Sequence, residues 1–346
     1  MSLFLFARSL LCALGLSAFA AVAHAQPAFP ERDAVRAALA EELGLEFVAE
    51  IPADADIGLL AVDFQRSFTD PDEALYVPGS ESDVAAVEAF VGAHLGRITN
   101  AWFTMDTHPR YYVGSELYLV DADGNPAPMF VDIDPAAVLD GTYRAANPNH
   151  QPNAEAYARC LAAKGLSWNV WPDHGEEGTD GWALHPGIER AFDAFTAYWA
   201  PRTRRAPDPM MVLKATNPHT EAFGGLEALC PNDDPATRPQ SLWLDELKDF
   251  TDAGGVIVAF GEAINFCVSG TLIPLAEAGI PAGQIILAYD ASSPIPIFAE
   301  RTRAVLAQAK DLGIRFTLLS DLTVDGAWRE TSSGQPLLNY TLPQPH

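Results

Sequence analysis

The sequence is poor in basic residues, and above all in lysine. Lysine and arginine together number 21, against 46 acidic residues, so the formal net charge is −25. The only lysines are Lys164, Lys214, Lys248 and Lys310. A surface this acidic repels phosphate groups, which argues against nucleic acids and anionic membranes as partners. Adaptation to salt is an alternative explanation of the same charge.

Long hydrophobic runs are also scarce. One of them, residues 9–22, follows Arg8 and ends just before an Ala-His-Ala sequence. This order of positive charge, short apolar core and small-residue site is typical of a secretory signal peptide, and we predict cleavage after Ala25. A membrane anchor is the alternative, but the run is shorter than the ~20 residues that span a bilayer. The sequence thus predicts a signal peptide at residues 1–25 and a periplasmic or secreted mature chain at 26–346.

Cysteine is rare, with four in the whole chain. Three of them, Cys160, Cys230 and Cys267, follow the predicted cleavage site. In an oxidising compartment an odd number leaves one thiol unpaired or paired with another chain. A bond between Cys160 and Cys230 would leave Cys267 free, but spacing alone does not decide the pairing.

Short apolar runs followed by polar or Gly/Pro residues recur along the chain. They lie at residues 57–65, 98–108, 210–218, 254–262, 284–292 and 314–321. Continuous apolar runs of this length are typical of strands buried on both faces of a parallel sheet. Helical patterns occur at residues 81–95, 241–254, 267–279 and 297–313. We therefore predict one α/β domain with a doubly wound, mostly parallel sheet flanked by helices, and a long insertion at about 109–171 that lies over one sheet edge.

Reactive side chains follow several of these runs. In an open α/β sheet, ligands bind beyond the carboxyl ends of the strands. Asp63 ends the first run and Lys214 the third, while Cys267 follows the fourth, where the start of a helix would favour its thiolate. An acid, a cation and a thiol at one edge are typical of a nucleophile with its base and charge partner. The alternatives are a buried filler role for Cys267 and a turn or capping role for Asp63.

A second group of side chains has the chemistry of metal ligands. Asp106 and His108 end the second apolar run two residues apart, so both point to the same face. His174 follows in a Trp-Pro-x-His sequence. Two imidazoles and a carboxylate suit Zn²⁺, Fe²⁺ or Mn²⁺ and leave positions for water or substrate. An ordinary Asp/His turn beside a solvated His174 is the alternative; we predict a divalent metal ion.

Seven motifs, in this order, resemble the isochorismatase-like cysteine hydrolases, and within them the nicotinamidase branch. They are "LLAVDFQRSF", "LYVPGSE", "WFTMDTHP", "WPDHGEEGTDG", "VLKATNPHTEAF", "GEAINFCVSGT" and "ILAYDASSP". The resemblance implies a triad in which Asp63 takes the proton of Cys267 and Lys214 orients both. It also implies a cis peptide bond between Glu262 and Ala263, and an oxyanion hole formed by the N–H groups of Ala263 and Cys267.

The resemblance also concerns the metal and the substrate pocket. It implies Asp106, His108 and His174 as metal ligands, and in nicotinamidases that ion holds the pyridine nitrogen of the substrate. Isochorismatases lack this metal set, so an amidase is favoured. Phe68 and Trp171 match positions of the pocket wall, where they would stack on a planar ring, and simple core packing is the alternative.

The predicted function is therefore metal-dependent hydrolysis of a small (hetero)aromatic amide to an acid and ammonia, through a thioester on Cys267. The alternatives are a related cysteine hydrolase acting on an N-carbamoyl or other small amide, and a periplasmic binding or metal-storage protein without turnover. Departures from the family pattern at residues 66–67, 264–265 and Gly175 touch the pocket and the fourth metal position. Family members often form homo-oligomers, while the sequence indicates no particular interface.

Overall fold

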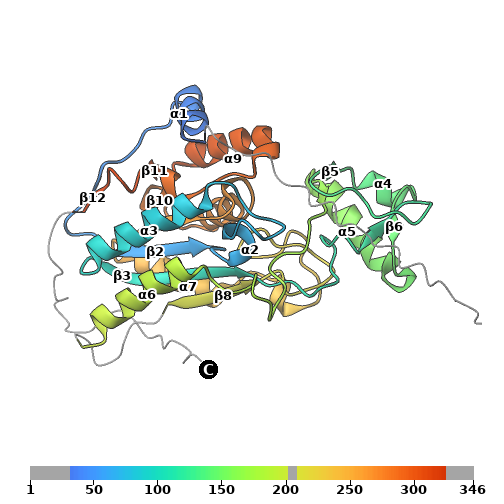
Figure 1. Cartoon of the computed structure of the whole chain (residues 1–346), viewed down its shortest axis with the longest axis horizontal. Helices are drawn as coiled ribbons and strands as arrows, with labels where there is room; N and C mark the ends of the chain where they lie inside the picture. The colour runs from blue at the N-terminus through green and yellow to red at the C-terminus, as the bar shows by residue number, and fades with distance from the viewer. Residues whose placement is uncertain (1–31, 202–208, 325–346) are drawn as a thin grey trace, which may run out of the picture.

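The computed structural model describes residues 32–201 and 209–324, so the predicted signal peptide lies outside the described residues. A six-stranded sheet forms its centre, from β2 (Ile57–Val62), β3 (Ile98–Asp106), β8 (Met210–Lys214), β9 (Val256–Gly261), β10 (Ile285–Ala288) and β11 (Arg315–Thr317). Their order is β11-β10-β9-β2-β3-β8, and every neighbouring pair is parallel (Figure 1). Each strand falls within one predicted apolar run. The parallel α/β sheet is confirmed.

Helices cover both faces of this sheet. On one face lie α3 (Ser80–His94) and α6 (Pro186–Trp199); on the other lie α7 (Ser241–Asp252), α8 (Ser269–Glu277) and α9 (Ala299–Leu312). Alternate residues of a strand point to opposite faces. Leu59 therefore packs with the first set of helices, and its neighbour Leu60 packs with the second. Burial on both sides explains why these strands read as unbroken apolar runs.

Strand β8 departs from the prediction that each run is buried on both faces. Val212 and Lys214 are buried, whereas Met211 and Leu213 are 45% and 42% exposed. Among the described strands, β8 pairs with β3 alone and forms the edge of the sheet. Helix α6 packs against β3, where the Phe192 ring contacts Phe103 with centroids 4.1 Å apart. The outer side chains of the edge strand are therefore left exposed.

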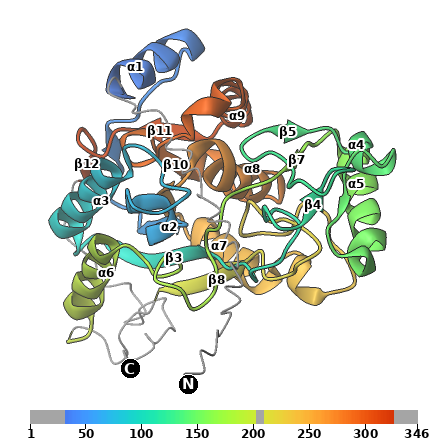
Figure 2. The ribbon, with the colours of Figure 1, turned by 45° about the vertical axis from the view of Figure 1, so that its right-hand side comes forward.

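The segment predicted as an insertion forms a small separate layer beside the carboxyl ends of the strands (Figure 2). It contains β4 (Leu119–Val120), β5 (Asp132–Ile133), α4 (Ala136–Leu139), β6 (Arg144–Ala145), α5 (Gln151–Lys164) and β7 (Trp168–Asn169). Its own apolar core includes Tyr118, Leu161 and Trp168.

A disulfide joins Cys160 of α5 to Cys230 in the loop after β8, and Cys267 is the free cysteine of the described residues. The pairing that the spacing left open is thus decided.

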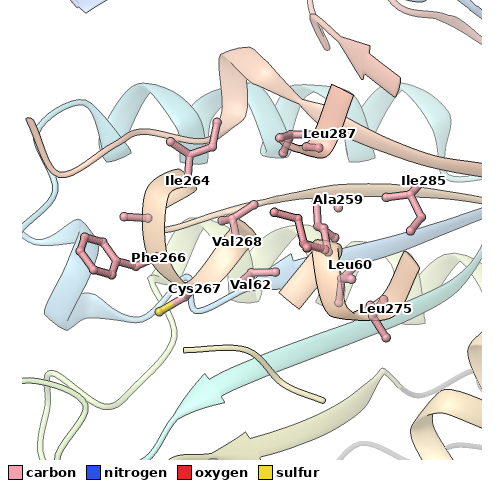
Figure 3. Close-up of a cluster of buried hydrophobic side chains, with 14 of the residues drawn as sticks. Leu60, Val62, Ala259, Ile264, Phe266, Cys267, Val268, Leu275, Ile285 and Leu287 are labelled. Carbon is pink, nitrogen blue, oxygen red and sulfur yellow. The ribbon is translucent and has the colours of Figure 1, made fainter. Parts of the chain in front are cut away.

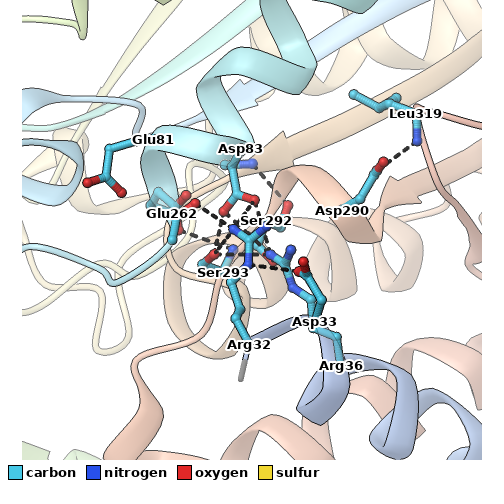
Figure 4. A network of polar contacts seen from close by, with 12 residues as sticks. Arg32, Asp33, Arg36, Glu81, Asp83, Glu262, Asp290, Ser292, Ser293 and Leu319 are labelled. Atoms are coloured by element: carbon cyan, nitrogen blue, oxygen red, sulfur yellow. Dashed lines mark hydrogen bonds and ion pairs between the residues drawn. The ribbon is translucent and has the colours of Figure 1, made fainter. Parts of the chain in front are cut away.

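Helix α1 (Arg32–Leu43) packs against α9 and was not predicted from the sequence (Figure 1). It places Arg32 and Arg36 against the buried carboxylate of Asp83 on α3, with N–O distances of 3.0 and 3.1 Å (Figure 4). The hydroxyl of Ser293 also donates to Asp83. These contacts join the start of the described chain to the segment that follows β10.

The remaining elements are short. They are β1 (Glu50–Ile51) paired with β12 (Thr323–Val324), α2 (Arg66–Thr69), the π-helical turn η3 (Ile264–Val268), and the 3₁₀ turns η1 (Pro148–His150), η2 (Pro235–Thr237), η4 (Ala282–Gln284), η5 (Tyr289–Ala291) and η6 (Pro296–Phe298). In residues 32–201 and 209–324, no helix has both the length and the apolar character needed to cross a bilayer.

Candidate active site

Three predicted catalytic side chains meet at the carboxyl edge of the sheet. Asp63 directly follows β2, Lys214 ends β8, and Cys267 lies in η3, after β9. The Nζ atom of Lys214 lies 3.0 Å from Oδ2 of Asp63 and donates to Sγ of Cys267 over 3.7 Å. None of the three residues is more than 7% exposed. The sheet order thus assembles an acid, a cation and a thiol in one buried cluster.

The backbone is unusual where two of these strands end. Asp63 has φ 49° and Ala215, which follows Lys214, has φ 60°, so both lie in the left-handed region. This conformation costs energy for a residue with a side chain, and such strain is concentrated at functional sites. The turn after β2 aims the Asp63 carboxyl at Lys214, and the turn after β8 begins the loop that returns the Ala222 carbonyl to the same ammonium.

Lys214 is held as a charged group. Its ammonium donates to Oδ1 of Asp106 and to the carbonyl oxygen of Ala222, both at 2.9 Å, in addition to its ion pair with Asp63. Burial lowers the pKa of Lys214, but the two carboxylates outweigh burial and raise that pKa well above its ordinary value. Lys214 is therefore a charge partner and not a proton acceptor.

Asp63 and Cys267 are both held toward their protonated forms. Burial raises the pKa of Asp63, against the charge of Lys214 and the hydrogen bond that the Thr104 hydroxyl donates at 2.6 Å. Burial likewise raises the pKa of the Cys267 thiol well above its usual range, and Asp63 adds to this effect while Lys214 opposes it. The sequence predicted a thiolate favoured by a helix start; in the structure Cys267 lies in η3, before α8 begins at Ser269, and burial is the largest effect on the pKa of its thiol. Asp63 is the neighbouring base that can remove the thiol proton.

The turn that carries Cys267 follows directly on β9. The peptide bond between Glu262 and Ala263 is cis, and η3 begins at the next residue. Figure 3 shows the Cys267 sulfur at the margin of the apolar cluster, pointing away from Val62 and Leu60. Ala263 and Cys267 line the same pocket. The two residues predicted for the oxyanion hole are thus brought together.

The two predicted wall residues also line this pocket. Phe68 and Trp171 are both 3% exposed. The Phe68 ring meets His174 edge-on, with centroids 5.6 Å apart, and Trp171 meets Phe266 in the same manner at 4.9 Å. Both side chains are packed in the core and also face the pocket. Core packing and a place in the pocket wall, which were considered as alternatives, therefore hold together. A small, mostly apolar pocket of this kind suits a planar ring.

The three predicted metal ligands form one buried cluster. Suitable ligand atoms of Asp106, His108 and His174 all lie within 4.8 Å of one another. The Asp106 oxygens lie 3.1 Å from Nε2 of His108 and 3.3 Å from Nε2 of His174. Nδ1 of His174 lies 2.8 Å from the carbonyl oxygen of Pro172, which would fix the tautomer that turns a lone pair of Nε2 toward the cluster.

This cluster passes a chemical test for a divalent ion. Both ring nitrogens of His108 are buried, and neither forms a hydrogen bond with a described residue, although Nε2 lies 3.1 Å from Oδ1 of Asp106. Burial raises the pKa of Asp106, but His108 and Lys214 outweigh burial and hold that pKa well below its ordinary value. A carboxylate and an unpartnered buried imidazole are the donors that a cation would satisfy. The residues present therefore fit a divalent metal.

Comparison with solved structures supports the same fold. A nicotinamidase/pyrazinamidase of Acinetobacter baumanii superposes with a TM-score of 0.51 at 18% identity, over 79% of this chain and 99% of that one. This chain has the nicotinamidase fold. The yeast nicotinamidase matches at 19% identity over 75% of this chain and 99% of its own, with a TM-score of 0.51. Its complex with the inhibitor nicotinaldehyde matches at 17% identity over 76% and 99%, with a TM-score of 0.50. No family model and no curated protein matches this sequence.

Within this nicotinamidase fold, the structure adds residues that sequence reasoning missed. Gln65 donates from Nε2 to the carbonyl oxygen of Asp106 at 2.8 Å and accepts from its N–H at 2.7 Å. Tyr112, from the insertion, stacks on His108 with ring centroids 3.8 Å apart. Oε1 of Glu221, in the loop after β8, lies 3.9 Å from Nε2 of His108. Gln65 belongs to the same apolar run as Asp63, so its position near the end of a strand could have marked it as a site residue. Tyr112 and Glu221 lie in loops, where no local sequence pattern marks them.

Proposed function

We propose that this chain is an exported, metal-dependent amidohydrolase of the nicotinamidase type, which converts a small (hetero)aromatic amide into an acid and ammonia. The observation that carries the proposal is the contact of Lys214 with both Asp63 and Cys267 at the pocket. A nucleophile, a base and a fixed positive charge in one buried cluster are the components of covalent amide hydrolysis. The shared fold with two nicotinamidases supports the same assignment.

In the first half of the reaction, Sγ of Cys267 attacks the amide carbonyl carbon while its proton passes to Asp63. The carbonyl electron pair moves onto oxygen, which the N–H groups of Ala263 and Cys267 would stabilise. Collapse of this intermediate breaks the C–N bond, and the leaving nitrogen takes the proton from Asp63. Ammonia departs and a thioester remains on Cys267. The positive charge of Lys214 offsets the negative charge that moves between sulfur and Asp63.

In the second half, water attacks the thioester carbon and gives a proton to Asp63. The C–S bond breaks, the acid product leaves, and the proton returns from Asp63 to the sulfur. The raised pKa of Asp63 suits a group that accepts a proton and later returns it. All atoms of the amide and of one water molecule are accounted for in the acid and ammonia.

Asp106, His108 and His174 are the residues that would hold the metal ion. When bound, a divalent ion would supply a Lewis-acidic position for a ring nitrogen of the substrate. Phe68 and Trp171 line the pocket and suit the faces or edges of a planar ring. This combination favours a nitrogen-containing aromatic amide such as nicotinamide. The yeast nicotinamidase that shares the fold was solved with nicotinaldehyde bound.

The disulfide between Cys160 and Cys230 supports the exported part of the proposal. Disulfides persist in oxidising compartments and are rare in the reducing cytosol. Together with the predicted signal peptide at residues 1–25, this bond favours the periplasm or the exterior of the cell. N-terminal sequencing of the secreted protein tests this point. A first residue of Gln26 is expected, and an intact N-terminus in the cytoplasm would contradict export.

The activity itself is tested by ammonia release from nicotinamide. Residues 26–346, loaded with Zn²⁺, Fe²⁺ or Mn²⁺, are compared with the Cys267→Ala variant. Turnover that vanishes in the variant is expected. Activity no higher than that of Cys267→Ala across a panel of aromatic and N-carbamoyl amides would overturn the proposal in favour of a binding protein. Turnover of the N-carbamoyl compounds alone would assign the second candidate function, a related cysteine hydrolase.

A further inference from the structure

Glu221 is a buried carboxylate that the mechanism above does not use. It is 5% exposed, and Oε2 has no hydrogen-bond partner among the described residues. Oε1 accepts one hydrogen bond, from the N–H of Ala222 at 2.8 Å. A buried carboxylate costs several kcal/mol when it is not paired with a cation. Its placement therefore needs a positive partner.

The geometry places this carboxylate at the predicted metal cluster. Glu221 lines the same pocket as Asp106 and His174. Oε1 of Glu221 lies 3.9 Å from Nε2 of His108, a ring nitrogen without a hydrogen bond in the part of the chain that the structure describes. Two metal–ligand bonds of ~2.1 Å span at most ~4.2 Å, so one ion can reach both atoms. Glu221 and His108 are thus within the reach of a single cation. Glu221 lies just outside the group of atoms within 4.8 Å of one another that Asp106, His108 and His174 form, so a turn of its side chain would bring it onto an ion held by those three.

The surrounding chain fixes the backbone of Glu221 beside the metal cluster. Its carbonyl oxygen accepts a hydrogen bond from the N–H of Leu229 at 2.7 Å, and the disulfide at Cys230 ties this loop to the insertion. The insertion passes the Glu221 side chain at Gly114. A Cβ atom at Gly114 would lie 2.6 Å from Oε2 of Glu221, so this position leaves the carboxylate the room it occupies.

We propose that Glu221 is a fourth protein ligand of the ion held by Asp106, His108 and His174. The inference rests on the metal that the proposed function assigns to those three residues. The ion would then bind two carboxylates and two imidazoles, one of the carboxylates supplied by the loop after β8. The negative charge of Glu221 would then be offset by the ion in the buried pocket.

Metal affinity tests this ligand role directly. The variant Glu221→Gln keeps the shape of the side chain and removes its charge, and Asp173→Asn is the matched control, because Asp173 adjoins His174 but is exposed. Zn²⁺ dissociation constants are measured for the metal-stripped proteins by competition with a chromophoric chelator. Glu221→Gln should weaken Zn²⁺ binding at least ~10- to 100-fold, the loss seen for partners that only support a ligand. Asp173→Asn should leave binding unchanged.

Two further readouts separate a ligand from a residue that merely maintains the fold. The Tm of Glu221→Gln in chelator should equal or exceed that of the wild type, because an unpaired buried charge is gone. The rise in Tm on adding Zn²⁺ should be smaller than in the wild type. The visible absorption of bound Co²⁺, which reports the ligand set, should change in Glu221→Gln and in the shorter Glu221→Asp, but not in Asp173→Asn.

The outcomes distinguish this inference from the proposed function. Equal Zn²⁺ affinity and equal Co²⁺ absorption in the wild type and Glu221→Gln would overturn the ligand role while the three-residue metal site stands. A change in KM for nicotinamide without a change in metal affinity would also overturn it and assign Glu221 to the substrate. A wild-type protein that binds no metal would overturn both this inference and the metal-dependent part of the proposed function.

Discussion

Lys214 and Asp106 form an ion pair of 2.9 Å that joins the catalytic cluster to the metal cluster. Oδ1 of Asp106 faces the Lys214 ammonium, and Oδ2 lies 3.3 Å from Nε2 of His174. Gln65 holds the backbone of Asp106 through two hydrogen bonds. One carboxylate therefore serves both groups, and the two sites are expected to respond together to any change at Asp106.

Replacing Lys214 with methionine should destabilise the protein strongly. The change removes the ammonium and leaves Asp63 and Asp106 buried without it. Breaking a buried ion pair by removing one partner costs about 3–5 kcal/mol of the free energy of unfolding. Urea denaturation in chelator measures this loss. The control is Lys248→Met on α7, which should change stability by no more than about 0.5 kcal/mol. A loss for Lys214→Met as small as that of the control would contradict the prediction.

Removing the metal should lower both stability and activity. An ion that binds the folded chain alone stabilises it by mass action, so Tm should fall when a chelator strips the ion. Nicotinamide turnover should disappear in parallel and return on adding Zn²⁺, Fe²⁺ or Mn²⁺. In the His174→Ala variant, the same additions should restore neither property fully. A chelated protein that keeps its Tm and its turnover would show that this site needs no ion.

Glu262 should make the protein less stable as the pH rises. Burial raises the pKa of Glu262 well above its ordinary value of 4.5, and the neighbouring carboxylate of Asp83 adds to the effect. The folded chain thus keeps a proton that the unfolded chain releases. This contribution is fully present below pH 4.5 and is lost as the pH rises through the raised pKa of the folded state.

The variant Glu262→Gln has no such proton to lose. Its free energy of unfolding should therefore depend less on pH than that of the wild type over roughly pH 5 to 8. Urea titrations at several pH values give the two curves. Glu277→Gln, an exposed change at the end of α8, is the control and should follow the wild type. Parallel curves for Glu262→Gln and the wild type would mean that Glu262 is ionised in the folded protein.

Loss of the disulfide should destabilise the chain. The bond between Cys160 and Cys230 closes a loop with a sequence separation of 70 residues. The double variant with serine at both positions should lose about 2–4 kcal/mol of the free energy of unfolding. Reduced wild-type protein should show a similar loss. If the double variant were as stable as the oxidised wild type, the link would contribute nothing to folding.

Local sequence patterns predict the framework of this fold well. The strands of the central sheet read as apolar runs because helices bury both of their faces. Helix α6 was not predicted, although its sequence carries the usual signals. Pro186 stands at its first position, and the apolar residues Ile188, Phe192 and Phe195 recur at helical spacing. Exposure of Met211 on β8 depends on sheet order, which the strand's own residues do not encode.

The residues of the site also divide into those that the sequence predicts and those that it does not. Asp63, Asp106 and Lys214 lie at strand ends, where the position of ligand sites in α/β sheets makes them predictable. Glu221 lies in a loop whose path is set by contacts with Leu229 and with the distant insertion, so its own sequence gives no signal. The raised pKa of Cys267 depends on burial and on neighbouring carboxylates, which only the assembled fold brings around the thiol.

The insertion with its own small core has a consequence for how this protein changes over time. It brings Trp171 to the pocket, Tyr112 against His108 and Gly114 against Glu221, while the proposed reacting groups lie at or just after the ends of the central strands. Mutations inside this module can accumulate against its separate core without disturbing the strand ends. The wall of the pocket and the proposed reacting groups can therefore change separately, and exchanging residues of this module is a direct route to altering which small molecules the pocket admits.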